Sequence, residues 1–63
     1  MPKKITLNLI GLNGNAFSIL GAFSKQARKE GWSEEDINHV TTLAKASDYD
    51  NLLRVMMQHT QNE

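Results

Sequence analysis

The sequence predicts a small α+β domain in which one N-terminal β-strand precedes three α-helices. Apolar and polar residues alternate over residues 3–10, which is the period of a half-buried strand. From residue 16 onward, apolar residues recur at helical spacing in three segments. Clusters of Gly, Asn, Ser and Asp separate these segments, as expected of turns. We therefore expect the order β-α-α-α in a single domain over residues 1–63.

The strand is predicted over about Lys3–Ile10, with Ile5, Leu7 and Leu9 on its buried face. No second strand is evident, and the polar residues 60–63 are expected to fray. A lone strand exposes unpaired backbone N–H and C=O groups, to which another strand can add. We therefore expect this strand to pair across a homodimer. Pairing within the chain, through an extended stretch of residues 11–13, is the alternative.

The helices are predicted over about residues 16–30, 34–46 and 48–59. The third follows the helical template closely, because its apolar residues fall at i, i+3, i+4, i+7 and i+8. These residues are Tyr49, Leu52, Leu53, Met56 and Met57.

Residues at the helix ends have the expected capping chemistry. Asn15, with Asn13 as the competing choice, is the predicted N-cap of the first helix, and Ser33 that of the second. Ser47 or Asp48 is predicted to cap the third.

Gly31 is placed to end the first helix in the left-handed region. Trp32, which follows it, can pack on both neighbouring helices, so we expect it to fix a helix–helix corner rather than to stack on a ligand.

Length and composition favour association over chemistry. A chain of 63 residues buries only about 60% of its unfolded surface and usually needs a further source of stability. Cysteine is absent and there are two histidines, so we predict no disulfide, no metal site and no cofactor. No nucleophile signature accompanies the histidines, and the chain has little room for a substrate pocket. The predicted class is a non-enzymatic protein, and oligomerisation remains as the source of added stability.

Charge is unevenly distributed, although the net charge is zero. The first 29 residues contain no acid, and all seven acids follow residue 29. The favoured explanation is that basic side chains end the first helix and acidic ones begin the second, as the helix dipole prefers. The alternative is a nucleic-acid-associated accessory protein that uses the basic residues of this half. The basic residues are Lys3, Lys4, Lys25, Arg28 and Lys29.

The loop between the strand and the first helix is a second alternative site. It contains Gly11, Asn13, Gly14 and Asn15, and loops at this position can bind anions or nucleotides at a helix N-terminus. Neither the P-loop pattern nor the dinucleotide-binding pattern is present. A strand-to-helix turn is the favoured interpretation, with anion or nucleotide binding as the alternative.

Five residues are predicted contacts with a partner or a second copy. Ile5, Leu7 and Leu9 are included because they lie on the strand, Gly21 because a mid-helix glycine permits close approach, and Met57 because Met repacks easily. No segment reaches the roughly 20 apolar residues that a membrane span requires, so we expect a cytoplasmic protein that does not bind membranes.

Two segments, Gly11–Gly21 and Ser47–Leu53, together with the Gly31-Trp32 pair, resemble small uncharacterised proteins of bacteriophages and bacteria. Those proteins have a GxDGNAFxILGxF-like start, a Gly-Trp corner and a GDYDxLL-like third helix. This chain departs from that pattern with Asn13 in place of Asp and Ser47 in place of Gly, and both exchanges are compatible with turns. The resemblance implies a small intracellular protein encoded by a phage or mobile element, and it assigns no catalytic or binding residue. We therefore expect an interaction protein that binds and modulates a host or phage protein.

Overall fold

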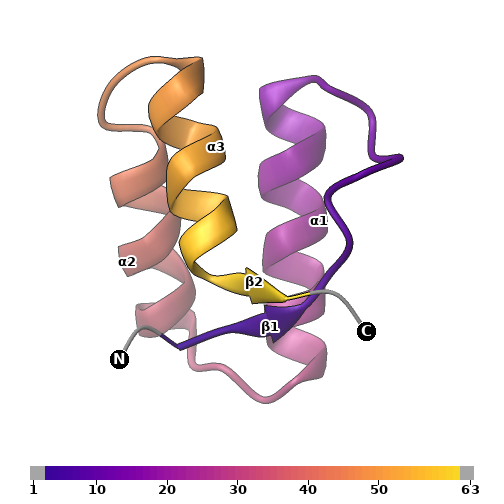
Figure 1. Ribbon diagram of the computed structural model, residues 1–63. Helices are drawn as coiled ribbons and strands as arrows, with labels where there is room; N and C mark the ends of the chain where they lie inside the picture. Colours follow the sequence, from indigo (N-terminus) through magenta and orange to yellow (C-terminus); the bar gives the residue numbers. More distant parts are fainter. Residues whose placement is uncertain (1–2, 62–63) are drawn as a thin grey trace.

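The computed structural model describes residues 3–61, which contain three helices and two short strands. The elements follow in the order β1 (Ile5–Thr6), α1 (Ala16–Lys29), α2 (Glu34–Ala44), α3 (Tyr49–Gln58) and β2 (Thr60–Gln61). The helices stand side by side and the strands cross their lower end (Figure 1). This arrangement confirms the predicted α+β class, with one strand followed by three helices. The first strand is shorter than predicted, and β2 was not predicted.

β1 pairs within the chain, in parallel with β2, so that Ile5 lies opposite Thr60 and Thr6 opposite Gln61. The Ile5 N–H donates to the His59 carbonyl at 2.9 Å, and the Leu7 N–H donates to the Gln61 carbonyl at 3.0 Å. The prediction that the chain frays from residue 60 is therefore wrong for residues 60–61, and residues 62–63 lie outside the described range. The partner strand is not the predicted stretch 11–13, because that stretch forms the turn before α1.

The opposite edge of β1 is closed by a side chain. The Thr6 N–H points away from β2 and donates to the Glu30 carboxylate at 2.8 Å. The same carboxylate oxygen accepts a hydrogen bond from Gln26 Nε2 at 2.8 Å. Both bonds stabilise the charged form of Glu30 and lower its pKa below the usual 4.5. β1 therefore needs no second copy of the chain to satisfy its N–H groups.

The predicted caps lie at the helix starts. Each cap side chain accepts a hydrogen bond from a backbone N–H of its own first turn, as the orphan donors of a helix require. Asn15 accepts at 2.8 Å, Ser33 at 3.1 Å and Asp48 at 2.9 Å. Of the two choices for α3, the structure therefore selects Asp48.

The α1–α2 corner forms as the Gly-Trp pair predicts. Gly31 has φ +91°, and its N–H donates to Arg28 O at 3.1 Å. The Trp32 N–H donates to Ala27 O at 3.0 Å, which completes the Schellman ending of α1. Trp32 is 7% exposed and packs edge-on against Phe23, with ring centroids 5.6 Å apart.

One continuous core joins β1 to the three helices. Its members are Ile5, Ile19, Phe23, Ala27, Trp32, Ile37, Val40, Ala44, Leu52, Val55 and Met56. On α3 the buried face differs from the predicted one, because Val55 is buried while Tyr49 and Met57 are exposed. α3 thus has more apolar residues than the core buries, and Met57 is one of those that remain exposed.

Candidate interaction surface

An open groove of about 620 Å³ lies between α3, β2 and the segment that follows β1. We call it the side groove. Its lining is contributed by the two ends of the described chain and by α3. The lining residues are Lys4, Asn8, Leu9, Ile10, Leu53, Met57, Thr60 and Gln61.

The apolar residues of the side groove are incompletely buried by the fold. Leu9 and Leu53 are half-buried and pack against the core, whereas Ile10 is 84% and Met57 66% exposed. Single exposed apolar residues are common on protein surfaces. Four that gather in one concave surface are characteristic of a binding site.

Lys4 is the one charged residue in this lining, as far as residues 3–61 are concerned. The salt bridges of residues 3–61 join Lys3 to Asp36 and Arg28 to Glu34, and neither involves Lys4. The side groove therefore combines an apolar surface with a cation that the described chain does not neutralise.

Two of the five predicted contact residues, Leu9 and Met57, meet in the side groove. Ile5 does not belong to a surface, because its side chain is completely buried, and its prediction as a contact was wrong. Leu7 is half-buried against the core. Gly21 lies elsewhere, in a shallow hollow between α1 and α2, and a Cβ added to it would meet no atom within 4 Å.

The predicted basic residues are divided by ion pairs. Arg28 donates twice to the Glu34 carboxylate, at 2.8 and 3.0 Å, and this hydrogen bonding lowers the pKa of Glu34. Lys3 donates to Asp36 at 2.9 Å, which likewise lowers the pKa of Asp36, and its ammonium lies 5.1 Å from the centre of the Trp32 ring. Two of the five cations thus have structural partners, which reduces the support for a nucleic-acid interface.

The loop before α1 uses several of its polar groups internally. The Asn15 N–H donates to Asn13 Oδ1 at 3.0 Å, and Asn15 Oδ1 in turn caps α1. The Gly14 carbonyl accepts from the Tyr49 hydroxyl, and Gly11 turns the chain with φ +95°. These contacts support the turn interpretation, and anion or nucleotide binding stays a prediction.

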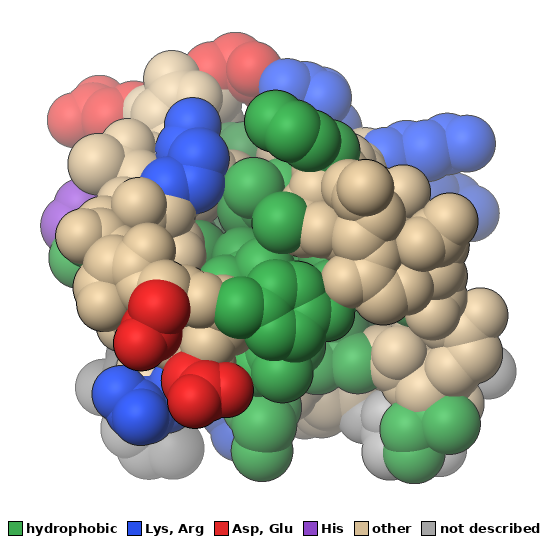
Figure 2. All heavy atoms as spheres, turned by 90° about the horizontal axis from the view of Figure 1, so that it is seen from above, with side chains coloured by type: hydrophobic (Ala, Val, Ile, Leu, Met, Phe, Trp, Pro, Cys, Tyr) green, Lys and Arg blue, Asp and Glu red, His purple; other side chains and the backbone are tan. Residues whose placement is uncertain are grey.

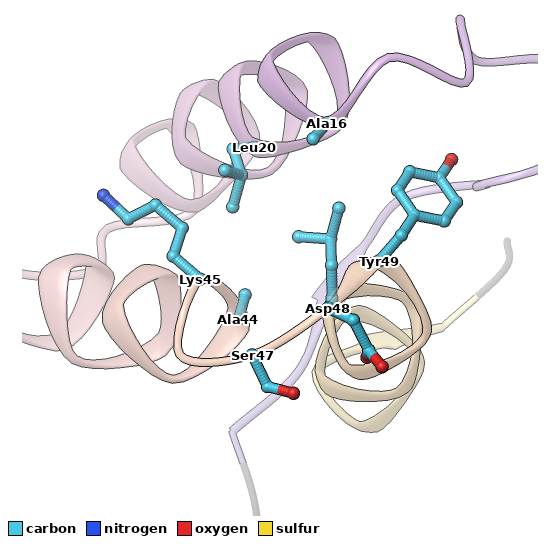
Figure 3. Close-up of a pocket in the computed structure, with 8 residues that line it drawn as sticks. Ala16, Leu20, Ala44, Lys45, Ser47, Asp48 and Tyr49 are labelled. Atoms are coloured by element: carbon cyan, nitrogen blue, oxygen red, sulfur yellow. The ribbon is translucent and has the colours of Figure 1, made fainter.

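A second hollow, of about 250 Å³, lies at the upper end of the helices and was not predicted. Figure 2 shows hydrophobic side chains in a band across this end, bordered by charged ones. In Figure 3, Ala16 and Leu20 of α1 face Ala44 and Tyr49, while the Ser47 and Asp48 side chains point away from α1. The side chains of Tyr49 and Asp48 already make hydrogen bonds within the chain, to the Gly14 carbonyl and to the first turn of α3. The hollow is also smaller than the side groove. We therefore regard the side groove as the stronger candidate.

The fold and these surfaces define a small α+β protein with an apolar, singly charged groove. No protein-family model, curated protein or solved structure matches the chain. Within the described range, no helix has the length and apolar character to cross a membrane. Nor do three His, Asp or Glu side chains of residues 3–61 gather as metal ligands.

Proposed function

We propose that this chain is a non-enzymatic interaction protein that binds another protein through the side groove. The observation that carries this proposal is the gathering of four apolar side chains in an open groove beside Lys4. Met57 matters most, because it is 66% exposed although Val55 and Met56, which precede it on α3, are buried. Met is adaptable and suits a surface that must fit a partner.

A non-enzymatic role agrees with the way the fold uses its histidine nearest the groove. His59 Nδ1 lies 2.8 Å from the Lys3 carbonyl, and its ring packs edge-on against Trp32 at 6.5 Å between centroids. These contacts fasten β1 to the end of α3 and give His59 a structural role.

The predicted homodimer belongs to this proposal in a changed form. Because β1 pairs with β2 and its other edge bonds to Glu30, two copies would meet through their side grooves rather than through a β1 ladder. A host or phage protein is the other partner class, as the resemblance implies. The cytoplasmic location also remains part of the proposal.

Site-specific photocrosslinking tests the proposal. A photoreactive residue is placed at position 57, and at position 17 as the control, because Phe17 is a comparably exposed apolar residue outside the side groove. In cells that carry the native gene, position 57 should give discrete crosslinked species above the monomer mass, and position 17 should not. Mass spectrometry then separates a second copy from a foreign protein.

Substitution sharpens the same experiment. Met57→Asp should weaken the interaction by about tenfold or more, since it puts a charge into an apolar contact. Phe17→Asp should leave the interaction unchanged. If Phe17→Asp abolishes the species and Met57→Asp does not, the interface lies at the hollow between α1 and α2, which Phe17 lines, and the proposal is wrong.

A further inference from the structure

We infer that the side groove receives an extended, acidic segment of a partner protein, which adds to the free edge of β2 as a third strand. This inference rests on the proposed function and names the chemistry of the partner. It follows from the direction of the β2 peptide groups, the faces of the small sheet and the charge of the groove.

The peptide groups of Thr60 face away from β1. The carbonyls of His59 and Gln61 accept hydrogen bonds from the N–H groups of Ile5 and Leu7, so the carbonyls on both sides of Thr60 point toward β1. Successive peptide groups of a strand alternate in direction, and therefore Thr60 presents its N–H and C=O to the opposite side. Thr60 and Gln61 also line the side groove. This edge of the sheet thus borders the groove.

The two edges of the sheet differ. At the outer edge of β1, the Thr6 N–H is occupied by the Glu30 carboxylate. At the outer edge of β2, no side chain of residues 3–61 accepts from Thr60, whose hydroxyl donates instead to the Met56 carbonyl at 2.8 Å. Strand addition at an open edge is a common way to bind extended peptides. Only the β2 edge leaves its donor available for it.

The faces of the sheet determine which side chains such a strand should have. Ile5 is buried and lies opposite Thr60, and residues opposite each other share a face of the sheet. The partner residue opposite Thr60 would therefore point toward the helices, where Leu53 and Met57 line the groove. Its two neighbours would point to the other face. Apolar residues are expected at the first position and polar ones at its neighbours.

The charge of Lys4 indicates which polar residues these two neighbours in the partner strand should be. Lys4 precedes Ile5, so it belongs to the outward face of the sheet, and it lines the side groove without an acidic partner in the described part of the chain. A carboxylate on the outward face of the added strand would complement it. The partner segment should therefore alternate apolar residues with Asp or Glu.

Titration of the whole, isotope-labelled chain with defined peptides tests this by NMR. The probe is an acetylated, amidated Val-Asp-Val-Asp-Val peptide, compared with Val-Lys-Val-Lys-Val and with the acidic peptide N-methylated at its central Val. We expect the acidic peptide to shift the amides of Thr60 and Gln61 and the methyl of Met57. It should bind about fivefold more tightly than the lysine peptide, as expected of an exposed ion pair. N-methylation should weaken binding, because it removes the donor to the β2 edge.

Two pairs of variants assign the effect. Lys4→Glu should reverse the preference between the acidic and basic peptides, while Lys25→Glu, the same exchange on the exposed side of α1, should not. Met57→Asp should abolish binding and Phe17→Asp should not.

The contrary results are distinct. Equal binding of the N-methylated peptide excludes strand addition, and equal binding of the two charged peptides excludes the carboxylate. If no peptide shifts the groove up to millimolar concentration, or if the groove signals depend on protein concentration alone, the inference is overturned. The proposed function survives either result as long as position 57 still crosslinks, and it fails together with the inference if position 57 does not.

Discussion

Two adjacent lysines, Lys3 and Lys4, lie in two regions of the molecule that differ in how far the chain satisfies its own polar and apolar groups. Lys3 belongs to the Trp32 corner, where it pairs with Asp36 and lies over the indole ring. Lys4 points to the other face of β1 and lines the side groove, where neighbouring apolar side chains stay exposed. Both regions set a cation beside apolar residues. They differ in whether the chain itself supplies the matching groups.

The Trp32 corner is self-contained. Its indole ring is 7% exposed, and it contacts Phe23 and His59 edge-on while Lys3 covers it. The side groove has no equivalent closure within residues 3–61, since Ile10 and Met57 remain largely in solvent. Completed polar and apolar contacts indicate a stabilising role, whereas incomplete ones indicate a surface for another molecule.

The largest expected effect is that of removing the corner. Trp32→Ala should cost about 3–5 kcal/mol, the usual loss when a buried aromatic residue is truncated to Ala. A domain of this size has a total stability of about 3–9 kcal/mol, so this loss removes a large fraction of it and the helical circular dichroism should disappear at a much lower temperature than in the wild type. Trp32→Phe, which keeps an aromatic ring against Phe23, serves as the milder control. Cooperative unfolding of Trp32→Ala at the wild-type temperature would show that the corner is not the centre of stability.

Two glycines give the next largest contrast. Gly31→Ala should destabilise by about 1–2 kcal/mol, because φ +91° is unfavourable for a residue with a Cβ. Gly21→Ala should stabilise by about 0.5–1 kcal/mol, since Gly21 is helical and an added Cβ meets no atom within 4 Å. Urea denaturation of both variants measures the difference. If Gly21→Ala instead weakens a complex without changing stability, Gly21 is a partner contact, as the sequence predicts.

The helices could be predicted because their signals are local. The caps Asn15, Ser33 and Asp48, and the ending at Gly31, each depend on residues within one turn of the chain. Such signals specify where a helix begins and ends whatever the rest of the fold does. Predicted and observed helix bounds accordingly agree within one or two residues.

β2 could not be predicted, because its two residues, Thr60 and Gln61, have no strand pattern of their own. They form a strand only because α3 ends beside β1, which lies some 55 residues earlier in the chain. The closure of the β1 edge by Glu30 is equally non-local, joining residues 24 positions apart. The side groove includes both residues of β2. Of its lining, only Leu9 and Met57 were therefore predicted as contacts with a partner or a second copy, and Lys4 as a contact with nucleic acid.

Acid should weaken the fold by a smaller amount. Hydrogen bonds from Gln26, Arg28 and Lys3 lower the folded-state pKa values of Glu30, Glu34 and Asp36, respectively, below the usual 4.5 for Glu and 3.8 for Asp. The unfolded chain then binds protons more readily, so this stabilisation is present above about pH 4.5 and is lost as the pH falls through the folded values.

The urea concentration at the unfolding midpoint should therefore decrease as the pH is lowered from 5 to 3. Added salt should reduce the part of this decrease that comes from the Lys3–Asp36 and Arg28–Glu34 ion pairs. Glu30→Gln should reduce this acid sensitivity. Glu35→Gln is the matched control, because Glu35 is exposed and makes no side-chain hydrogen bond within residues 3–61. An unchanged midpoint down to pH 3 would mean that these carboxylates do not contribute to stability.

The smallest expected effect on stability is in the side groove. Met57→Asp should change the free energy of unfolding by no more than about 0.5 kcal/mol, because Met57 is 66% exposed and contributes little to the core. Val55→Asp, two positions away on the same helix, should unfold the chain, since Val55 is 8% exposed. Thermal unfolding of the two variants compares the faces of α3 directly. A large loss of stability in Met57→Asp would mean that this methionine serves the fold and that its exposure has no functional cause.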